Sequence, residues 1–201
     1  ILKNADPEMR KSINQILRYP DNSAGSIMTT EYVSLRPSMT VEEAILRIRR
    51  QGVDKETIYT CYVTTGRVLM GIVTVKDLLL AESDEQTIED IMLTSVISVH
   101  THTDQEEVAS MLAHYDFLAL PVVDGEDRMV GIVPFDDAMD VMEEEATEDM
   151  ELMSGMTPSE KPYLRSSSFE LFKNRIPWLM LMMVSATFTG LIMTAFEDAL
   201  A

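Results

Sequence analysis

The chain has 201 residues, a hydrophobic fraction of 46% and a formal net charge of −18. This length and composition suit one or two domains with a buried core. The charge excludes nucleic acid as a natural partner, because affinity for phosphate comes from patches of Lys and Arg, and it favours a cation instead. The single cysteine, Cys61, excludes a disulfide and a CxxC metal site. The chain begins at Ile1 without Met, and we expect it to be part of a longer protein.

The first predicted elements are a helix and a repeat. Residues 7–19 predict a helix that ends before Pro20. After it the sequence repeats itself, and two copies of one supersecondary unit usually pack together and share a core. The aligned pairs are residues 27–48 with 91–112, and residues 71–79 with 131–139.

Each copy opens with a short β run, residues 32–35 or residues 96–99, followed by a helix. Thr40 with Glu43 three positions later forms a capping box that predicts the start of the first helix. In the second copy, Asp104 takes the capping position and Glu107 the answering one.

Two further β runs then form a hairpin in each copy, with turns predicted at Gly66 and Gly125. A second helix closes each copy, over residues 76–82 and residues 136–153. Because strands and helices alternate along the chain, the predicted class is α/β.

The closing helix of the second copy is unusually acidic. Residues 136–149 hold eight carboxylates and no Lys or Arg. Like charges three or four residues apart lie side by side on a helix and cost roughly 0.2–0.5 kcal/mol each. A solvated acidic face and a cation-binding face are both compatible with this run. We expect the helix to pack through an apolar stripe made by Met139, Met142, Ala146, Met150 and Met153.

Residues 176–196 carry no charged side chain and are long enough to cross a membrane as a helix. Lys173 and Arg175 precede them and Glu197 follows, which places the N-terminal side in the cytoplasm. A buried core helix is the alternative. Before this segment we expect a bend over residues 154–168, then a capping box of Ser167 and Glu170 that starts a helix running into the span.

The repeat resembles a tandem pair of CBS domains, through "MT" at residues 28–29 and "GIVTVKD" at residues 71–77. With "HYDFLALPVVD" at residues 114–124, "ATED" at residues 146–149 and the apolar segment after them, nearly the whole chain resembles the MgtE family of magnesium transporters. The resemblance implies a tandem CBS pair, an acidic connecting ("plug") helix and one transmembrane helix. The expected domains are residues 1–24 (end of a preceding helical N domain and linker), 25–88 and 89–137 (the two CBS domains), 138–175 (connecting helix and linker) and 176–197 (first transmembrane helix).

The resemblance also implies a homodimer in the cell membrane, with residues 1–175 in the cytoplasm, that senses magnesium and closes a multi-pass pore. Magnesium is a hard cation that keeps several waters and needs only one or two carboxylates, so loose acidic clusters are expected. Ligands from the N domain and the pore lie outside this sequence. The magnesium-contacting positions that the resemblance implies are Glu106, Asp116, Asp137, Asp140, Glu145, Glu148 and Asp149.

CBS pairs often bind adenine nucleotides, and the resemblance implies ATP as a second ligand. Its pattern is met by Gly71, Thr74 and Asp77, and Tyr59 is placed to stack on the base. Pro134 breaks the pattern in the second copy. Capping of the following helix by Thr74 and Asp77 is an equally good explanation of the pattern.

Two functions from different classes remain open. The first is the magnesium-sensing and gating region of a magnesium channel or transporter, and the second is a nucleotide-sensing CBS module of another membrane protein. We do not expect an enzyme, because the sequence shows neither a nucleophile–base pair nor a phosphate loop.

Overall fold

The computed structural model describes residues 19–157 and 167–200. The chain divides into two units, residues 1–142 and residues 143–201. Apart from Tyr19, the helix expected over residues 7–19 lies outside the described residues. The first unit holds two small sheets with their helices, and the second holds the end of one helix and all of another.

The first copy folds into a three-stranded sheet with order β1-β2-β3. β1 lies parallel to β2, and β2 forms an antiparallel hairpin with β3. The predicted strands and helices are present in the predicted order, and a one-turn η2 extends the first helix. The elements are β1 (Ser34–Leu35), α3 (Val41–Gln51), η2 (Gly52–Asp54), β2 (Thr60–Thr65), β3 (Val68–Thr74) and α4 (Val75–Leu79).

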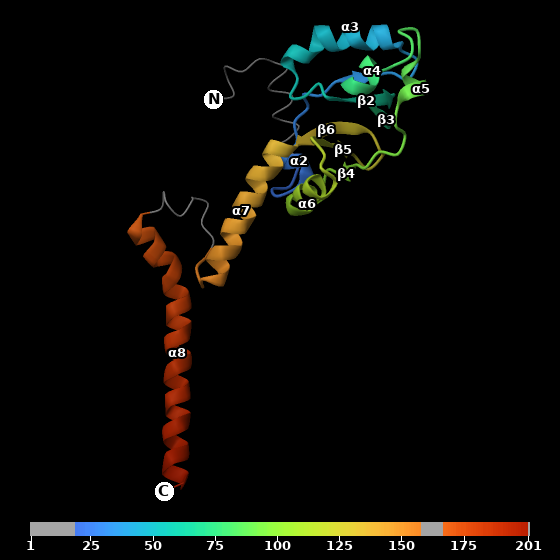
Figure 1. Cartoon of the computed structure of the whole chain (residues 1–201). Helices are drawn as coiled ribbons and strands as arrows, with labels where there is room; N and C mark the ends of the chain where they lie inside the picture. Colours follow the sequence, from blue (N-terminus) through green and yellow to red (C-terminus); the bar gives the residue numbers. More distant parts are fainter. Residues whose placement is uncertain (1–18, 158–166, 201) are drawn as a thin grey trace. The chain divides into compact units, whose positions relative to one another are not determined.

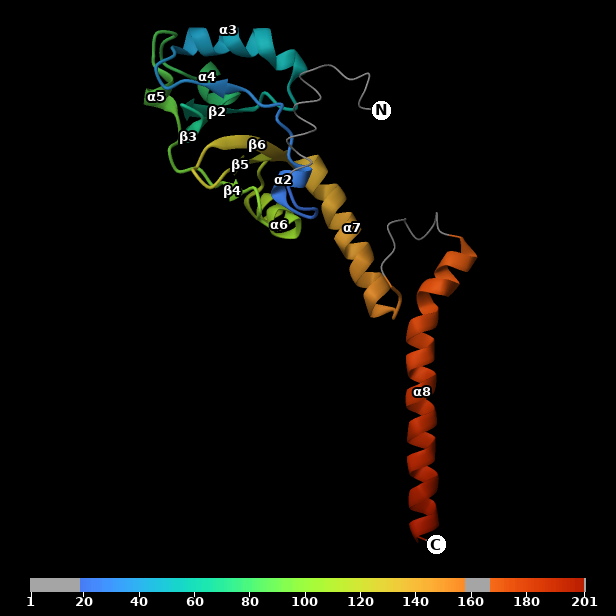
Figure 2. The ribbon, with the colours of Figure 1, turned by 180° about the vertical axis from the view of Figure 1, so that it is seen from behind.

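The second copy repeats this arrangement in a sheet with order β4-β5-β6. Figures 1 and 2 show the two sheets side by side, with α3 outside the first and α6 outside the second. The repeat therefore forms two similar halves, which confirms the α/β class. The elements are β4 (Val99–His100), α6 (Gln105–Tyr115), β5 (Ala119–Val123), β6 (Met129–Pro134) and α7 (Phe135–Met153).

The predicted helix starts are confirmed, with one change. The hydroxyl of Thr40 accepts a hydrogen bond from Glu43 N at 3.2 Å, and Thr40 N donates to the Glu43 carboxylate at 3.3 Å. Asp104 caps α6 by accepting from Glu106 N at 2.9 Å. This cap is a single bond from the second helical residue, and the expected answer from Glu107 is not part of it.

The two hairpin turns differ. Gly66 (φ +58°) and Arg67 (φ +76°) both take left-handed conformations between β2 and β3, as a two-residue hairpin turn requires. Gly125 lies in the second turn as predicted, but Asp127 is the residue that takes the left-handed conformation there, at φ +56°. The Asp124 carboxylate organises this turn by accepting from the backbone N–H of Arg128 at 3.0 Å.

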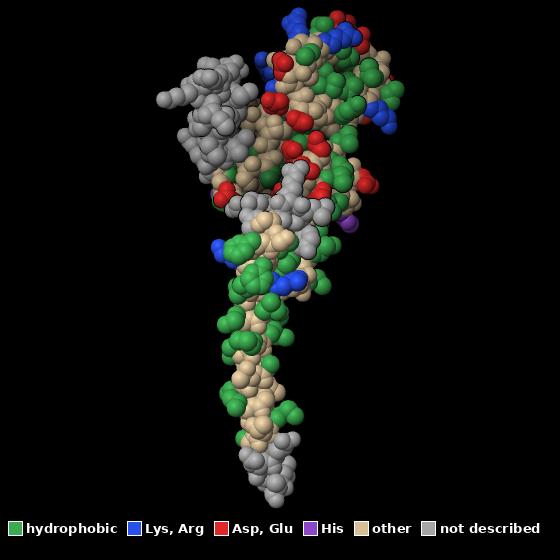
Figure 3. Space-filling model, turned by 90° about the vertical axis from the view of Figure 1, so that its left-hand side faces the viewer, with side chains coloured by type: hydrophobic (Ala, Val, Ile, Leu, Met, Phe, Trp, Pro, Cys, Tyr) green, Lys and Arg blue, Asp and Glu red, His purple; other side chains and the backbone are tan. Residues whose placement is uncertain are grey.

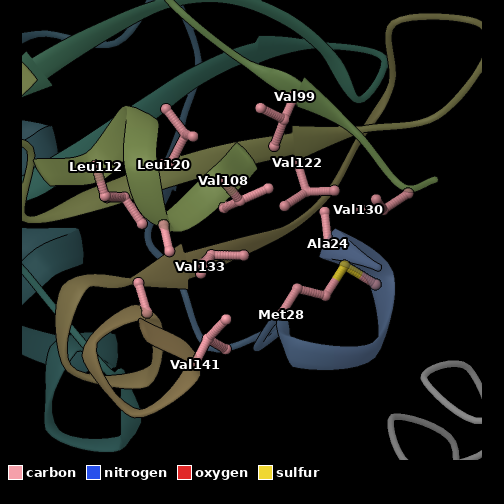
Figure 4. Close-up of a cluster of buried hydrophobic side chains, with 12 residues drawn as sticks. Ala24, Met28, Val99, Val108, Leu112, Leu120, Val122, Val130, Val133 and Val141 are labelled. Carbon is pink, nitrogen blue, oxygen red and sulfur yellow. The ribbon is translucent and has the colours of Figure 1, made fainter. Parts of the chain in front are cut away.

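Each copy is completed by a short helix from outside its own sheet. α2 (Ala24–Ile27) packs into the core of the second copy, where Ala24 and Met28 lie among valines of β5 and β6 (Figure 4). α5 (Ile88–Ile91) places Ile88 in the core of the first copy. The two halves therefore exchange their opening segments.

Paired backbone hydrogen bonds fix this exchange. Thr29 and Ile132 donate to each other's carbonyl at 2.8 and 2.9 Å. Ile72 and Leu93 do the same in the other half, at 2.9 and 2.8 Å. Because β6 and β3 each gain a partner from the other copy, neither half forms its sheet edge alone.

A third apolar cluster lies between the two halves, and Tyr62 of β2 is buried in it with Met129 and Ile132 of β6. The Tyr32 ring meets the Tyr62 ring edge-on, with centroids 5.9 Å apart. Met129 N also donates to the Arg67 carbonyl at 2.8 Å, which joins the two hairpins. The predicted shared core is confirmed by this cluster.

The first turns of α7 pack differently from the prediction. Ala138 and Val141 are buried, whereas Met139 and Met142 are 54% and 46% exposed. The predicted methionine stripe is therefore wrong as the packing face of this helix within the first unit. Ala146, Met150 and Met153, which belong to the second unit, are also exposed.

α8 (Ser168–Leu200) begins directly after Ser167 and runs through the apolar segment without interruption, as predicted. It is long and apolar enough to cross a membrane over Leu171–Phe196, 26 residues with a mean hydropathy of 1.9. None of the most apolar window is buried, and hydrophobic side chains project along the length of the helix (Figure 3).

Candidate functional site

The three residues predicted to contact a nucleotide lie at one end of the first sheet. Tyr59 precedes β2 directly, and its carbonyl accepts a hydrogen bond at 3.0 Å from Val75 N, at the start of α4. Thr74 and Asp77 flank Val75. Tyr59 is 67% exposed, so its ring is available to a flat ligand. The structure thus brings together Tyr59, Thr74 and Asp77.

The capping explanation of Thr74 and Asp77 is also realised. The Asp77 carboxylate accepts from Thr74 N at 2.9 Å and from the Thr74 hydroxyl at 2.5 Å, through the same oxygen. Thr74 in turn accepts from Asp77 N at 3.2 Å. One Asp77 oxygen is therefore committed to the helix cap, and a ribose would have to be held by the other.

The same position in the second copy has no such cap. Pro134 ends β6 where Thr74 ends β3, and Phe135 N donates to the Leu118 carbonyl at 3.0 Å as Val75 N does to Tyr59. Leu118 replaces the exposed tyrosine. The pattern expected of a nucleotide site is therefore present in the first copy and broken in the second.

Two of the predicted magnesium positions lie at opposite ends of α6. Glu106 is in its first turn, and Asp116 is its C-cap residue in a left-handed conformation (φ +53°). A helix of this length spans about 16 Å. The structure therefore does not bring Glu106 and Asp116 together, although both carboxylates are exposed.

The other five predicted magnesium positions lie along α7. Asp137 and Asp140 are one turn apart in the first unit. Glu145, Glu148 and Asp149 form a second group, in the second unit. Over residues 19–157 and 167–200, no three acidic, histidine or cysteine side chains come together as a metal site. The seven magnesium positions stay a prediction.

Asp137 is an acid whose surroundings disfavour its negative charge. The pKa of its carboxyl is raised above the usual value, first by partial burial and then by the negative charges of Asp136, Glu56 and Asp140. Glu56 belongs to the first copy, and sequence reasoning missed it. No local pattern in the sequence marks Glu56, because it reaches Asp137 only through the packing of the two copies.

Replacing Asp137 by Asn is expected to stabilise the chain when divalent cations are removed. A raised carboxyl pKa means that ionisation is disfavoured in the folded state, so stability falls as pH rises through the unfolded-state pKa toward the folded one. The variant should therefore melt higher at about pH 7 and lose this advantage as pH falls toward about 4. For a solvent-screened carboxyl, the gain is about 0.5 kcal/mol, or about 1–2 °C for a chain of this size.

The measurement is a thermal melt in EDTA at both pH values. Asp21→Asn is the matched control, because it removes the same charge from an exposed turn. Equal melting temperatures for the two variants at neutral pH would contradict local repulsion at Asp137.

Comparison with known proteins assigns the fold. The family model for the CBS domain matches residues 24–84 and 88–144. A magnesium transporter MgtE from Thermus thermophilus is 42% identical over 197 residues, which cover 97% of this chain and 43% of the relative. An MgtE from Bacillus subtilis is 36% identical over 99% of this chain and 44% of its own length. The chain thus spans less than half the length of these curated relatives.

Solved structures of magnesium transporters also match this chain. The cytosolic domain of the Mg²⁺ channel MgtE in complex with ATP matches with a TM-score of 0.66 and 46% identity, over 68% of this chain and 55% of that one. The soluble part of a magnesium transporter matches with a TM-score of 0.69 and 42% identity, over 72% and 57%.

Enzymes with CBS domains match over a shorter stretch. An inosine-5'-monophosphate dehydrogenase from Korarchaeum cryptofilum is 32% identical over 55% of this chain and 22% of its own length. Three relatives that extend over 92–99% of this chain are named magnesium transporters. The chain belongs to the CBS-domain family, and its tandem pair is similar to the CBS region of the MgtE magnesium transporters.

Proposed function

We propose that this chain is the cytosolic magnesium-sensing and gating region of a magnesium channel or transporter, together with its first membrane helix. The observation that carries the proposal is the order of parts in an MgtE-family chain. A CBS pair is followed by α7, in which residues 136–149 include no Lys or Arg. An apolar helix of membrane-spanning length comes next. The similarity of the whole chain to magnesium transporters supports it.

The mechanism follows from charge. Without divalent cations, the carboxylates of α7 repel one another and their neighbours, as the raised pKa of Asp137 illustrates. Magnesium neutralises them, and it needs only one or two carboxylates per hydrated ion, so exposed pairs such as Asp137 and Asp140 have suitable chemistry. In this proposal the cytosolic region has two states, one splayed by the repulsion between the acids and one compact. Because magnesium binds the compact arrangement more tightly, rising magnesium shifts the population toward it.

In this proposal the compact arrangement closes the pore, so high internal magnesium stops entry. The protein works as a homodimer in the cell membrane, with residues 1–175 in the cytoplasm. A helical N domain and the remaining pore helices complete it. Several weak sites give a steep response, since each adds its own binding free energy to the closed state.

A second candidate function is nucleotide sensing by the CBS pair of another membrane protein. Exposed Tyr59 beside Thr74 and Asp77 supports it, as does a 46% identical structure described as a complex with ATP. Under this alternative the acids of α7 are a solvated surface. It predicts stabilisation by ATP and none by magnesium beyond the effect of ionic strength.

The deciding experiment is a magnesium flux assay on the full-length protein in liposomes, with a fluorescent magnesium indicator inside. Raising magnesium on the side of the CBS pair should slow uptake. In a full-length variant in which the seven predicted magnesium-contacting acids are replaced by their amides, uptake should stay fast. Equal inhibition of both proteins would contradict magnesium sensing by this region.

A further inference from the structure

The turn that ends α7 has a defined geometry. Met156 N donates to the Glu151 carbonyl at 2.9 Å, and Gly155 N donates to the Leu152 carbonyl at 3.0 Å. Gly155 itself is left-handed, at φ +66°. This is the Schellman pattern, which satisfies the last helix carbonyls and reverses the chain direction. The path of the chain beyond the acidic helix is therefore set by its own backbone.

Trp178 of α8 packs directly on this turn. A Cβ built on Gly155 would lie 2.5 Å from Trp178 Cδ1 and 2.6 Å from Nε1. The indole ring thus occupies the space that any other side chain would need. Glycine is required at position 155 twice over, for its conformation and for this contact.

A second contact joins the same two segments. Thr157 N donates to the Asn174 carbonyl at 3.2 Å, and the Thr157 hydroxyl lies 3.4 Å from the same oxygen. The acceptor belongs to the turn of α8 that precedes Pro177. Proline has no N–H, so the Lys173 carbonyl lacks its helical donor and the helix is weakened there. In Figures 1 and 2, α8 changes direction near its start.

We propose that Gly155, Thr157, Asn174 and Trp178 form a joint that ties the end of the acidic helix to the start of the membrane helix. Because the joint lies beside the turn that Pro177 weakens, movement of α7 is passed to the direction in which α8 begins. This role rests on the proposed function, in which magnesium moves α7. Trp178 acts as a positioning residue within the joint.

Trp178 is the only tryptophan in the sequence, so its fluorescence reports on the joint alone. The test uses the full chain in lipid bicelles, which add no tryptophan, and time-resolved anisotropy of Trp178 in EDTA. Gly155→Asn is the informative variant, since Asn tolerates the left-handed conformation while its Cβ conflicts with the indole. The fast local motion of Trp178 should increase in amplitude.

The matched control is Gly66→Asn. Gly66 has nearly the same conformation (φ +58°), but a Cβ there would have no atom within 4 Å. Its Trp178 anisotropy should equal that of the unsubstituted chain. Pro177→Ala is a second variant, which restores the N–H toward Lys173; it should strengthen the turn of α8 that carries Asn174 and thereby change the motion of the indole. Unchanged Trp178 motion in both Gly155→Asn and Pro177→Ala would overturn the joint.

A magnesium titration of the same samples separates the joint from the proposed function. The Trp178 signal of the unsubstituted chain should respond to magnesium, and Gly155→Asn should lose this response while keeping its magnesium-dependent rise in melting temperature. A full Trp178 response in Gly155→Asn would overturn the joint as the route of coupling. If magnesium does not raise the melting temperature of the unsubstituted chain, the proposed function fails, and the measurements in EDTA alone decide the joint.

Discussion

Magnesium is expected to raise the melting temperature of the chain in nanodiscs, and the double substitution Asp140→Ala with Glu148→Ala is expected to remove most of that rise. A site at ten times its Kd stabilises the state that binds by about 1.4 kcal/mol. For a chain of about 200 residues, this corresponds to about 3–6 °C for each occupied site. The measurement is a melt from zero to tens of millimolar magnesium.

The rise with magnesium is the quantity to compare, and not the starting melting temperature. Alanine favours a helix and removes repulsion, so the double variant should start higher than the unsubstituted chain. Asp21→Ala with Glu85→Ala is the matched control, because it removes two exposed acids far from α7 in the sequence. It should keep the full rise.

Melts with potassium, calcium and ATP distinguish magnesium binding from charge screening and from nucleotide binding. Potassium at equal ionic strength should have little effect, since it only screens charge. Calcium accepts more and longer oxygen contacts than magnesium, so its effect measures the selectivity of the sites. A rise with ATP alone, together with magnesium acting only as potassium does, would favour the nucleotide alternative over a magnesium sensor.

The sequence predicts the local features of the fold well. The capping box at Thr40, the turn at Gly66 and the order of elements in both copies depend on residues close together in the chain, and all are confirmed. The exchange of α2 and α5 between the two halves was not predicted. Those helices have four residues each, too few for a periodic pattern, and they are held by contacts distant in the sequence.

The candidate site divides in the same way. Tyr59, Thr74 and Asp77 come together because they surround one hairpin. Glu56 beside Asp137 could not be predicted, since 80 residues separate them. The packing face of α7 was misread because the helix has apolar residues on two sides, and periodicity alone cannot distinguish Ala138 and Val141 from the exposed methionines.

The exchanged segments lead to the largest expected loss of stability. A Cβ on Gly131 would lie 2.7 Å from the Thr29 carbonyl oxygen and 2.7 Å from the sulfur of Met28. Met28 has a flexible side chain and can move, but Thr29 is held to Ile132 by two backbone hydrogen bonds. Gly131→Ala therefore has to push β6 away from the backbone at Thr29. Overpacking of this kind costs about 1–3 kcal/mol.

The comparison with Gly125→Ala tests this explanation. Gly125 lies in the hairpin turn before the same strand, and a Cβ there would meet no atom within 4 Å. We expect Gly131→Ala to lower the melting temperature by about 2–12 °C and Gly125→Ala to leave it nearly unchanged. Gly71→Ala, whose Cβ would lie 2.8 Å from the Leu93 carbonyl oxygen, should repeat the loss in the other half.

Equal and small effects of all three substitutions would show that the exchanged segments yield easily to the strands they pair with.

A loss of stability at both Gly71 and Gly131 would mean that the exchanged segments are firmly held, and this constrains how α7 can move. α7 follows β6 directly and buries Ala138 and Val141 in the same core that holds Ala24 and Met28. The exchanged segment α2 and the start of the acidic helix thus share one rigid core, so the first turns of α7 move only with the second copy.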